Sequence, residues 1–360
     1  MLSQPPAAAF AAKIAGRSLM NRKPNLKDVA KLAGVSAITV SRVLTTPEKV
    51  SDKLRQKIEQ AIHELGYIRN HAASALASNR SGVLAVIIPS LSNIVFNEVL
   101  QGIYSAVKPH QLQVILGDCH YSPLEEEKLI ATLLSQAPEG VILTGTDQTD
   151  YARKLLQNAG IPVVQLMELT DQPIDINIGF SHLDAGMAMT QHLLARGYRR
   201  IGFLGARMDQ RTQQRLAGFK RAIEDWNLTQ ARESQALCQQ FVVTTGQSSS
   251  IKLGGQLLQA VMAESQGHCD AVFCCNDDLA LGALFEARKM NLRVPADLAI
   301  AGFNDLEASA LVEPGITSVA APRFAMGKQA VELLMQKASG NQTEFPPIDV
   351  GYSIMVRGST

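Results

Sequence analysis

The sequence lacks several features that would assign it to a familiar class of protein. Its 360 residues include 5 Cys, an odd number, and none of them form a CxxC pair. Cys274 and Cys275 are adjacent and cannot readily bridge each other. This pattern predicts a reduced, cytosolic chain rather than a disulfide-stapled secreted domain. The 7 His show no metal-ligand spacing, so we expect no metal site.

Long apolar runs are also missing. No run reaches the roughly 18 residues that a membrane-spanning helix needs, and we expect no membrane association. Near the N-terminus, Lys13 and Arg17 follow the apolar stretch, whereas a signal peptide carries its charges first. Because Pro5 and Pro6 disfavour an early helix, residues 1–24 are predicted to be a flexible leader.

The motifs of nucleotide-dependent and hydrolytic enzymes do not occur. No GxGxxG follows the first predicted strand, and GxxxxGK[ST] and GxSxG are absent. Cys274 and Cys275 fall in a strand of buried character, where Cys usually serves as inert packing. We therefore expect neither an enzyme nor a bound cofactor.

The charge that is present is unevenly distributed. Residues 1–80 carry 13 Lys and Arg against 5 Asp and Glu, whereas the remaining 280 residues carry 21 against 28. The overall net charge of +1 hides this division. A small basic head on a larger acidic body predicts that the head meets a polyanion and that the body does not.

The head, at residues 25–68, has the spacing of three short helices. Asn25 and Ser36 are placed to cap the first two, and Gly34 falls at the turn between them, where a left-handed backbone is often required. The first two helices have the spacing of a helix-turn-helix, in which an exposed Arg42 can read guanine in the major groove. An ordinary helical hairpin with a solvated Arg42 is the alternative.

The body, at residues 81–360, alternates strand and helix patterns. Continuous apolar runs predict buried strands at residues 83–89, 112–117, 140–145, 161–167, 200–205, 271–276, 298–303 and 316–321. Helical stretches lie between them, as at 123–136, 182–196, 210–226, 277–290 and 323–339. The alternation predicts doubly wound parallel sheets. About nine or ten strands are many for one such sheet, and two similar lobes with a cleft between them are the natural alternative. Residues 348–356 also look strand-like.

Specific segments resemble a known family. LKDVAKLAGVSAITVSRVL, followed by VSDKLRQKIEQAIHELGYIRN, closely resembles the head of the LacI/GalR family of bacterial repressors. GVLAVIIPSLSN, ARGYRRIGFLGA, CNDDLALGAL and VPADLAIAGFND resemble blocks of its body, which has two α/β lobes of the periplasmic-binding-protein type. Within the family, ELTDQPIDINIGF and LGARMDQRT look most similar to the gluconate and related sugar-acid repressors.

The resemblance implies roles for residues of the head. Ala37, Ile38 and Arg42 are expected to face base edges, with apolar contact replacing hydrogen bonds at the first two. Hydroxyl groups are expected on phosphates at Ser36, Thr39, Ser41, Thr45 and Ser51.

Residues 69–80 are implied to be a hinge helix that folds on the operator against its dimer mate. Its DNA contacts are expected at Asn70, Ala73 and Leu76, with Leu76 as a wedge that opens a base step. A simple linker, with Leu76 filling a domain seam, is the alternative. Arg69 replaces the Pro that is common before Asn70 in the family, which leaves the rigidity of the hinge open.

In the body, polar residues follow apolar strands, where open α/β sheets place ligand sites. These positions and the resemblance together predict effector contacts at Ser90, Glu168, Arg207, Arg211, Arg215, Asn276, Asn304 and Arg323. Asn304 and Arg323 replace the acidic and uncharged residues of many relatives, which favours an anionic sugar acid held by arginine. Arg207 and Arg211 as solvated loop charges, and Asn276 and Asp277 as helix caps, are the alternatives.

The resemblance implies a cytoplasmic, nucleoid-associated repressor. It would bind a palindromic double-stranded operator as a homodimer and leave it when a gluconate-like sugar acid binds. A solute-binding protein whose head contacts another partner is the alternative from a different class, and the basic head disfavours it.

Overall fold

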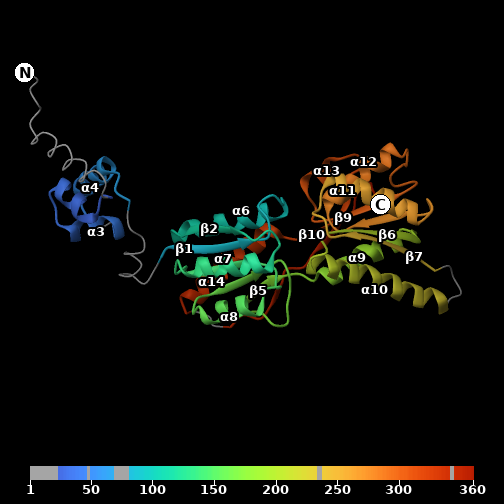
Figure 1. Cartoon of the computed structure of the whole chain (residues 1–360), viewed down its shortest axis with the longest axis horizontal. Helices are drawn as coiled ribbons and strands as arrows, with labels where there is room; N and C mark the ends of the chain where they lie inside the picture. Colours follow the sequence, from blue (N-terminus) through green and yellow to red (C-terminus); the bar gives the residue numbers. More distant parts are fainter. Residues whose placement is uncertain (1–22, 47–48, 69–80, 233–236, 341–343) are drawn as a thin grey trace, which may run out of the picture. The chain divides into compact units, whose positions relative to one another are not determined.

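The computed structural model describes residues 23–46, 49–68, 81–232, 237–340 and 344–360, and it divides the chain into two compact units (Figure 1). One unit spans residues 1–81 and the other residues 82–360. The expected hinge contacts Asn70, Ala73 and Leu76 lie outside the described residues.

The head contains three helices, α2 (Leu26–Ala33), α3 (Ala37–Thr45) and α4 (Asp52–Leu65). Asn25 caps α2 in a capping box with Asp28, and the Ser36 side chain caps α3 by accepting from the Thr39 N–H. Gly34 has φ 62°, the left-handed conformation predicted at the turn. Ser51 occupies the N-cap position of α4, but its side chain makes no capping bond. The helices bury an apolar core of Val29, Ala30, Ala33, Val40, Val43, Ile58 and Ala61.

The first sheet of the body has the order β11-β5-β4-β3-β1-β2, and all its pairings are parallel. Its strands are β1 (Val83–Ile88), β2 (Gln113–Asp118), β3 (Gly140–Thr144), β4 (Val163–Leu166), β5 (Ile176–Gly179) and β11 (Ile348–Asp349). The helices of this lobe are α6 (Val95–Val107), α7 (Pro123–Leu134), α8 (Asp150–Asn158) and α14 (Arg323–Ala338), with a short 3-10 turn, η2 (Lys108–His110). We call this part the first lobe.

The second sheet has the order β12-β10-β9-β8-β6-β7. Its strands are β6 (Arg200–Ala206), β7 (Gln239–Thr245), β8 (Ala271–Cys274), β9 (Ala299–Phe303), β10 (Thr317–Ala320) and β12 (Ser353–Met355). Only β12 runs antiparallel to its neighbour, β10. The helices of this second lobe are α9 (His182–Ala195), α10 (Gln210–Arg232), α11 (Ile251–Glu264), α12 (Asp277–Lys289) and α13 (Glu307–Leu311).

The prediction of two doubly wound lobes is confirmed. The eight apolar runs named from the sequence all contain strands, and the two sheets have corresponding strand orders. The chain crosses between lobes after β5, after β10 and between β11 and β12. Residues 348–356 were predicted as one strand-like segment. They divide at Gly351, whose φ is 69°, so that β11 joins the first sheet and β12 the second.

Other expectations concern absences and buried thiols. Among the described residues, no helix combines the length and the apolar character needed to cross a bilayer. The same residues contain no group of three or more His, Cys, Asp or Glu that could hold a metal ion. All five Cys are buried and free. Burial raises the pKa of the Cys275 thiol to about 11, which keeps it protonated and unreactive at neutral pH.

Candidate functional site

Three adjoining hollows lie between the two lobes of the body, where the strands of both sheets end. The central hollow, of about 510 Å³, is lined by Asn93, Val95, Phe96, Tyr121 and Met167 of the first lobe and by Ala206, Arg207, Asp209, Arg211, Thr212, Arg215, Ser249, Asn276 and Asn304 of the second. Five of the eight residues predicted to contact an effector therefore meet here.

The second hollow, which we call the acidic hollow, shares Tyr121, Asp209 and Arg211 with the central one. Its further lining includes the carboxyl groups of Glu126, Asp147 and Glu168, within a volume of about 420 Å³. The outer hollow contains Ser90, Ser92, Asn93, His120, Tyr121, Arg207, Ser248, Ser249 and Asp278. Glu168 and Ser90, two further predicted residues, thus lie beside the central hollow.

Arg207 follows β6 and stacks on an aromatic ring of the opposite lobe. Its guanidinium carbon is 3.7 Å from the centre of the Tyr121 ring, and the Tyr121 hydroxyl accepts a hydrogen bond of 2.6 Å from Asn93 Nδ2. Within the described part of the chain, no carboxylate forms an ion pair with Arg207. The cation is therefore available to an anion in the hollow.

Arg211 lies in the first turn of α10, with 12% of its side chain exposed. Its Nη2 is 3.6 Å from Asp209 Oδ2, and Asp209 also accepts from the Thr212 N–H at 2.9 Å. Burial opposes the charge of Arg211, but attraction to Asp209 and Glu168 outweighs it and raises the pKa of this guanidinium. Arg211 is thus a permanent cation on the wall between the central and acidic hollows.

Arg215, one turn further along α10, makes more contacts with other protein groups than Arg207 or Arg211 does. Its Nε donates to His182 Nδ1 at 3.2 Å, and its guanidinium donates to the Cys275 carbonyl and stacks 3.7 Å from the centre of the Phe303 ring. Burial lowers the pKa of Arg215 to about 10, which leaves it charged at neutral pH. Arg215 forms part of the floor of the central hollow, and its orientation is fixed.

His182 orients Arg215, a role that the sequence analysis did not indicate. The ring is fully buried, and its Nε2 lies 3.0 Å from the Met167 carbonyl. Burial and the neighbouring Arg215 hold the pKa of His182 well below its usual range. A neutral ring that donates from Nε2 and accepts at Nδ1 satisfies both contacts.

Glu168 follows β4 and is 1% exposed. Its Oε1 accepts a hydrogen bond of 2.6 Å from Gln214 Nε2. Burial raises the pKa of Glu168, and the nearby Arg211 partly offsets that effect. A Cβ on Gly179 would lie 2.5 Å from the Glu168 backbone. Because Gly179 has no side chain, the backbone at Glu168 can pack closely against the end of β5.

Asn276 and Asn304 follow neighbouring strands of the second lobe. Asn276 is the N-cap of α12, and its Oδ1 accepts from the Leu279 N–H at 3.1 Å and from Ser249 Oγ at 2.9 Å. The capping role that the sequence allowed for Asn276 is therefore present, and the residue also lines the central hollow. Asn304 has φ 110°, an uncommon conformation for a residue with a side chain.

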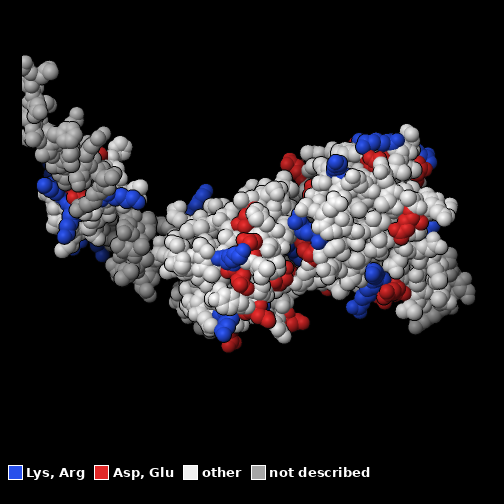
Figure 2. Space-filling view, in the orientation of Figure 1, with Lys and Arg blue, Asp and Glu red and all other residues white. Residues whose placement is uncertain are grey.

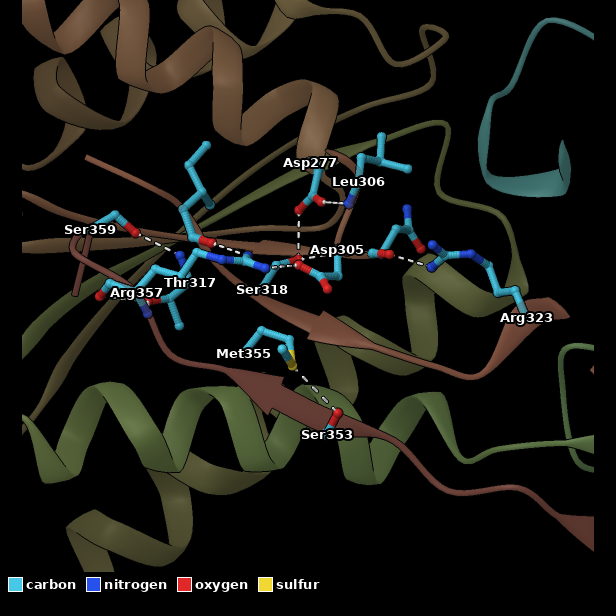
Figure 3. A network of polar contacts seen from close by, with 12 residues as sticks. Asp277, Asp305, Leu306, Thr317, Ser318, Arg323, Ser353, Met355, Arg357 and Ser359 are labelled. Carbon is cyan, nitrogen blue, oxygen red and sulfur yellow. Dashed lines mark hydrogen bonds and ion pairs between the residues drawn. The ribbon is translucent and has the colours of Figure 1, made fainter. Parts of the chain in front are cut away.

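Two residues considered for the site have other surroundings. Asp277 is fully buried, and its carboxylate accepts from the Leu306 N–H and from Ser318 Oγ, each at 2.7 Å (Figure 3). Arg323 does not line any of the three hollows. It is 4% exposed, and its guanidinium donates to the Asn304 carbonyl and pairs with Glu98.

Several lining residues escaped prediction from the sequence. Tyr121, Asp209, Glu126 and Asp147 all belong to loops or first helical turns that follow strands. The rule that found Arg207 and Glu168, namely that ligand sites gather at the carboxyl ends of parallel strands, applies to these positions as well. Applying it to every residue of the loops and first helical turns that follow the predicted strands would have identified them.

The head presents a separate candidate surface on α3. Ser36, Ser41 and Arg42 are exposed, and Ile38 is 72% exposed. Ala37 and Thr39 are partly buried, and Ser36 Oγ lies 2.8 Å from Thr39 Oγ1. Thr45 ends α3, and Ser51 is exposed before α4.

The head also carries many exposed basic side chains. Figure 2 shows Lys and Arg on the visible face of the head, and the exposed cations among its described residues are Lys23, Lys27, Lys31, Arg42, Lys49, Lys53 and Lys57. Cations of this density favour contact with phosphate.

Comparisons with known proteins agree with these features. The family described as bacterial regulatory proteins, lacI family, matches residues 25–70, and the periplasmic binding protein-like domain matches residues 190–360. The HTH-type transcriptional regulator GntR of Pseudomonas aeruginosa is 43% identical over 341 residues, which cover 94% of this chain and 96% of that protein.

Two solved structures extend the similarity to the whole architecture. A LacI family transcriptional regulator from Silicibacter pomeroyi superimposes with a TM-score of 0.84 at 35% identity, covering 93% of this chain and 99% of that one. The lac repressor dimer bound to operator and an anti-inducer gives a TM-score of 0.76 at 27% identity, covering 94% and 99%.

Proposed function

This chain belongs to the LacI family of bacterial regulatory proteins, and from that membership we propose that it is a transcriptional repressor whose affinity for operator DNA is controlled by a sugar acid. The head reads the operator, and the cleft of the body binds the effector. In this proposal, the protein acts in the cytoplasm, on the DNA of the nucleoid. It is not an enzyme, and it needs no cofactor.

DNA reading is assigned to α3. The exposed Arg42 offers a bidentate contact to guanine, and the exposed Ile38, with Ala37, offers an apolar contact to thymine methyl groups. Ser36, Thr39, Ser41, Thr45 and Ser51 fix the head on phosphates. A homodimer presents two such helices to the half-sites of a palindrome, and the lac repressor, to which this chain is similar, binds its operator as a dimer.

The hinge completes the DNA contact. We assign residues 69–80 to a helix that forms on the operator, with Asn70 and Ala73 in the minor groove and Leu76 as the wedge between base pairs. Because such a helix requires both DNA and its dimer mate, separating the two hinges lowers operator affinity.

The charge of the central hollow is the main support for a sugar acid as the effector. Arg207, Arg211 and Arg215 line it, whereas Asp209 is its one acidic lining residue among those described. A carboxylate on the ligand would neutralise positive charge at Arg207 and Arg211. It would also accept paired hydrogen bonds from one guanidinium group. Glu168, Asn276, Asn304 and Ser90 supply acceptors and donors for hydroxyl groups. Together these groups suit a polyhydroxy acid of the gluconate class, and the GntR relative is consistent with this choice.

The effector acts by closing the cleft. Arg207 and Tyr121 already join the lobes across it, so an anion bound beside them would strengthen the closed arrangement. Closure shifts one lobe relative to the other and separates the hinges of the dimer, so that effector and operator binding oppose each other. The sugar acid is therefore an inducer.

Isothermal titration calorimetry on the full chain tests the effector assignment. Gluconate and 2-ketogluconate are expected to bind, and glucose is expected to bind at least tenfold more weakly because it lacks the carboxylate. Preferential binding of a neutral hexose or a purine would contradict the proposal. A gel shift with palindromic and random DNA at moderate salt tests the head, and failure to bind either DNA would favour a solute-binding protein instead.

A further inference from the structure

The turn that follows β9 holds two residues in left-handed backbone conformations. Asn304 has φ 110° and Asp305 has φ 52°. Residues with side chains avoid this region, and they persist there only where their surroundings fix them. Since Asn304 lines the central hollow, whatever fixes this turn also sets how Asn304 meets a ligand.

The second lobe fixes the turn at three points, the first of which is the bond of 2.8 Å from the Asn304 N–H to the Val319 carbonyl. The Asp305 N–H donates to Ser318 Oγ at 3.0 Å, and the Leu306 N–H donates to Asp277 Oδ2 at 2.7 Å. Ser318 Oγ in turn donates to Asp277 Oδ1, which joins these two anchors, and the Asp305 carboxylate pairs with Arg357 at 2.6 Å (Figure 3). These contacts secure the N–H groups of Asn304, Asp305 and Leu306, but they leave the Asn304 carbonyl to another partner.

That partner is Arg323, the first residue of α14. Its Nη1 donates to the Asn304 carbonyl, and its Nη2 lies 2.9 Å from Glu98 Oε1 on α6. Figure 3 shows the Arg323 side chain directed at the turn. The residue is 4% exposed, and its buried Nε has no hydrogen-bond partner among the described residues. A buried guanidinium with an unpaired donor is an inefficient way to stabilise a fold, so its position calls for another explanation.

The helices that carry Arg323 and Glu98 are locked together. A Cβ on Gly102 of α6 would lie 2.1 Å from the Phe324 carbonyl oxygen, and one on Gly327 of α14 would lie 2.1 Å from the Val99 carbonyl oxygen. Backbones this close cannot slide past each other without a clash. Arg323 and Glu98 therefore belong to one rigid part of the first lobe, and the bond to Asn304 is their link to the second lobe.

We propose that Arg323 is a positioning residue rather than an effector contact: it holds the Asn304 carbonyl so that the Asn304 side chain faces the central hollow, and Glu98 couples that position to α6. This inference rests on the proposed sugar-acid function. It changes the role of Arg323 expected from the sequence, and it makes Asn304 the point at which ligand binding is transmitted between the lobes.

A double-mutant cycle separates positioning from direct contact. On the full chain, Arg323→Gln and Asn304→Ala are each expected to weaken gluconate binding about tenfold in calorimetry. Because Arg323 acts through Asn304, the double variant should bind like Asn304→Ala alone. Additive losses, about a hundredfold in the double variant, would show that Arg323 contacts the ligand itself and would overturn the inference.

Glu98 provides a second test that spares the buried arginine. Glu98 is half-exposed, so Glu98→Gln is expected to fold, to weaken gluconate binding severalfold and to have no further effect on Arg323→Gln. The matched control is Glu125→Gln on α7, where Glu125 pairs with Lys128 at 2.7 Å on the surface; it should leave binding unchanged. If Glu98→Gln behaves like the control, the coupling to α6 is wrong. If the unmodified chain binds no sugar acid, that result contradicts the proposed function, and the inference about Arg323 is then wrong as well.

Discussion

The Arg207 guanidinium carbon lies 3.7 Å from the centre of the Tyr121 ring, so a cation of one lobe stacks on an aromatic ring of the other. Both residues have left-handed backbones, with φ 65° at Arg207 and 57° at Tyr121. The loops on either side of the cleft thus store strain where they meet. This contact links the two lobes beside the central hollow.

Removing the Tyr121 ring is expected to weaken sugar-acid binding. Tyr121→Ala leaves Arg207 without its stacking partner, and a cation–π contact of about 0.5–2 kcal/mol corresponds to between about twofold and thirtyfold in affinity. Tyr121→Phe keeps the ring and loses only the bond from Asn93, so it should retain most of the affinity. Calorimetry with gluconate measures both variants, and equal losses in the two would show that stacking is unimportant.

Removing Arg42 is expected to relax operator specificity. Loss of a bidentate guanine contact costs about 1–3 kcal/mol and affects one position of each half-site. Arg55→Ala is a matched control, since Arg55 is engaged by Asp52 at 2.8 Å on α4. Fluorescence anisotropy with a set of singly substituted operators measures the change. Equal weakening on every operator, with no change in preference, would assign Arg42 to phosphate contact instead.

Ile38 and Val40 share α3 and differ in burial. Ile38 is 72% exposed, whereas Val40 is fully buried in the core of the head. Ile38→Ala should lower operator affinity by about 1 kcal/mol, or roughly fivefold, without changing the unfolding of the head. Val40→Ala should destabilise the head by about 1–3 kcal/mol. Chemical unfolding followed by circular dichroism, beside operator titration, distinguishes them; an Ile38 variant as unstable as the Val40 variant would place Ile38 in the core.

Glu126 is expected to make the stability of the body depend on pH. Burial raises the pKa of its carboxyl from 4.5 to about 7, and the bond from Gln148 offsets part of that effect. Between about pH 4.5 and about pH 7, the folded chain retains on Glu126 a proton that the unfolded chain has released. The stability that Glu126 contributes is therefore fully present below about pH 4.5. It is lost as the pH rises through about 7 and amounts to about 3 kcal/mol at most.

The check is a comparison with Glu126→Gln, which cannot ionise. Between about pH 5 and about pH 8, the unmodified chain should lose stability relative to the variant by up to that amount. Trp226, the single Trp of the chain, lies in α10 and reports unfolding of the body by fluorescence. Parallel pH profiles in the two proteins, at one protein concentration, would contradict the prediction.

The sequence predicted most strands because of their burial. Continuous apolar runs such as residues 140–145 mark strands covered on both faces, as β3 is. β7 was missed because it lies at the edge of the second sheet, and its residues are partly or fully exposed. β5 was missed because only four residues pair, in a segment whose polar Asn177 interrupts the apolar pattern.

The candidate site was predictable in part for a similar reason. Arg207 and Glu168 follow apolar strands directly, so the strand rule located them. The partners that determine their chemistry come from distant segments, and spacing along the chain carries no information on such contacts. The stacking of Tyr121 on Arg207 and the bond from Arg323 to Asn304 join residues 86 and 19 positions apart. These two contacts could be identified only from the three-dimensional structure.

The most direct test of this account is operator binding by the full chain with and without a sugar acid. Anisotropy of a labelled palindromic operator should show tight, salt-sensitive binding that falls at least tenfold when gluconate is added and is unchanged by glucose. The same titration with Arg207→Met should show normal operator binding and little response to gluconate, because the cation offered to the carboxylate is gone. Operator affinity that is indifferent to every sugar acid, or that rises with gluconate, would contradict the account.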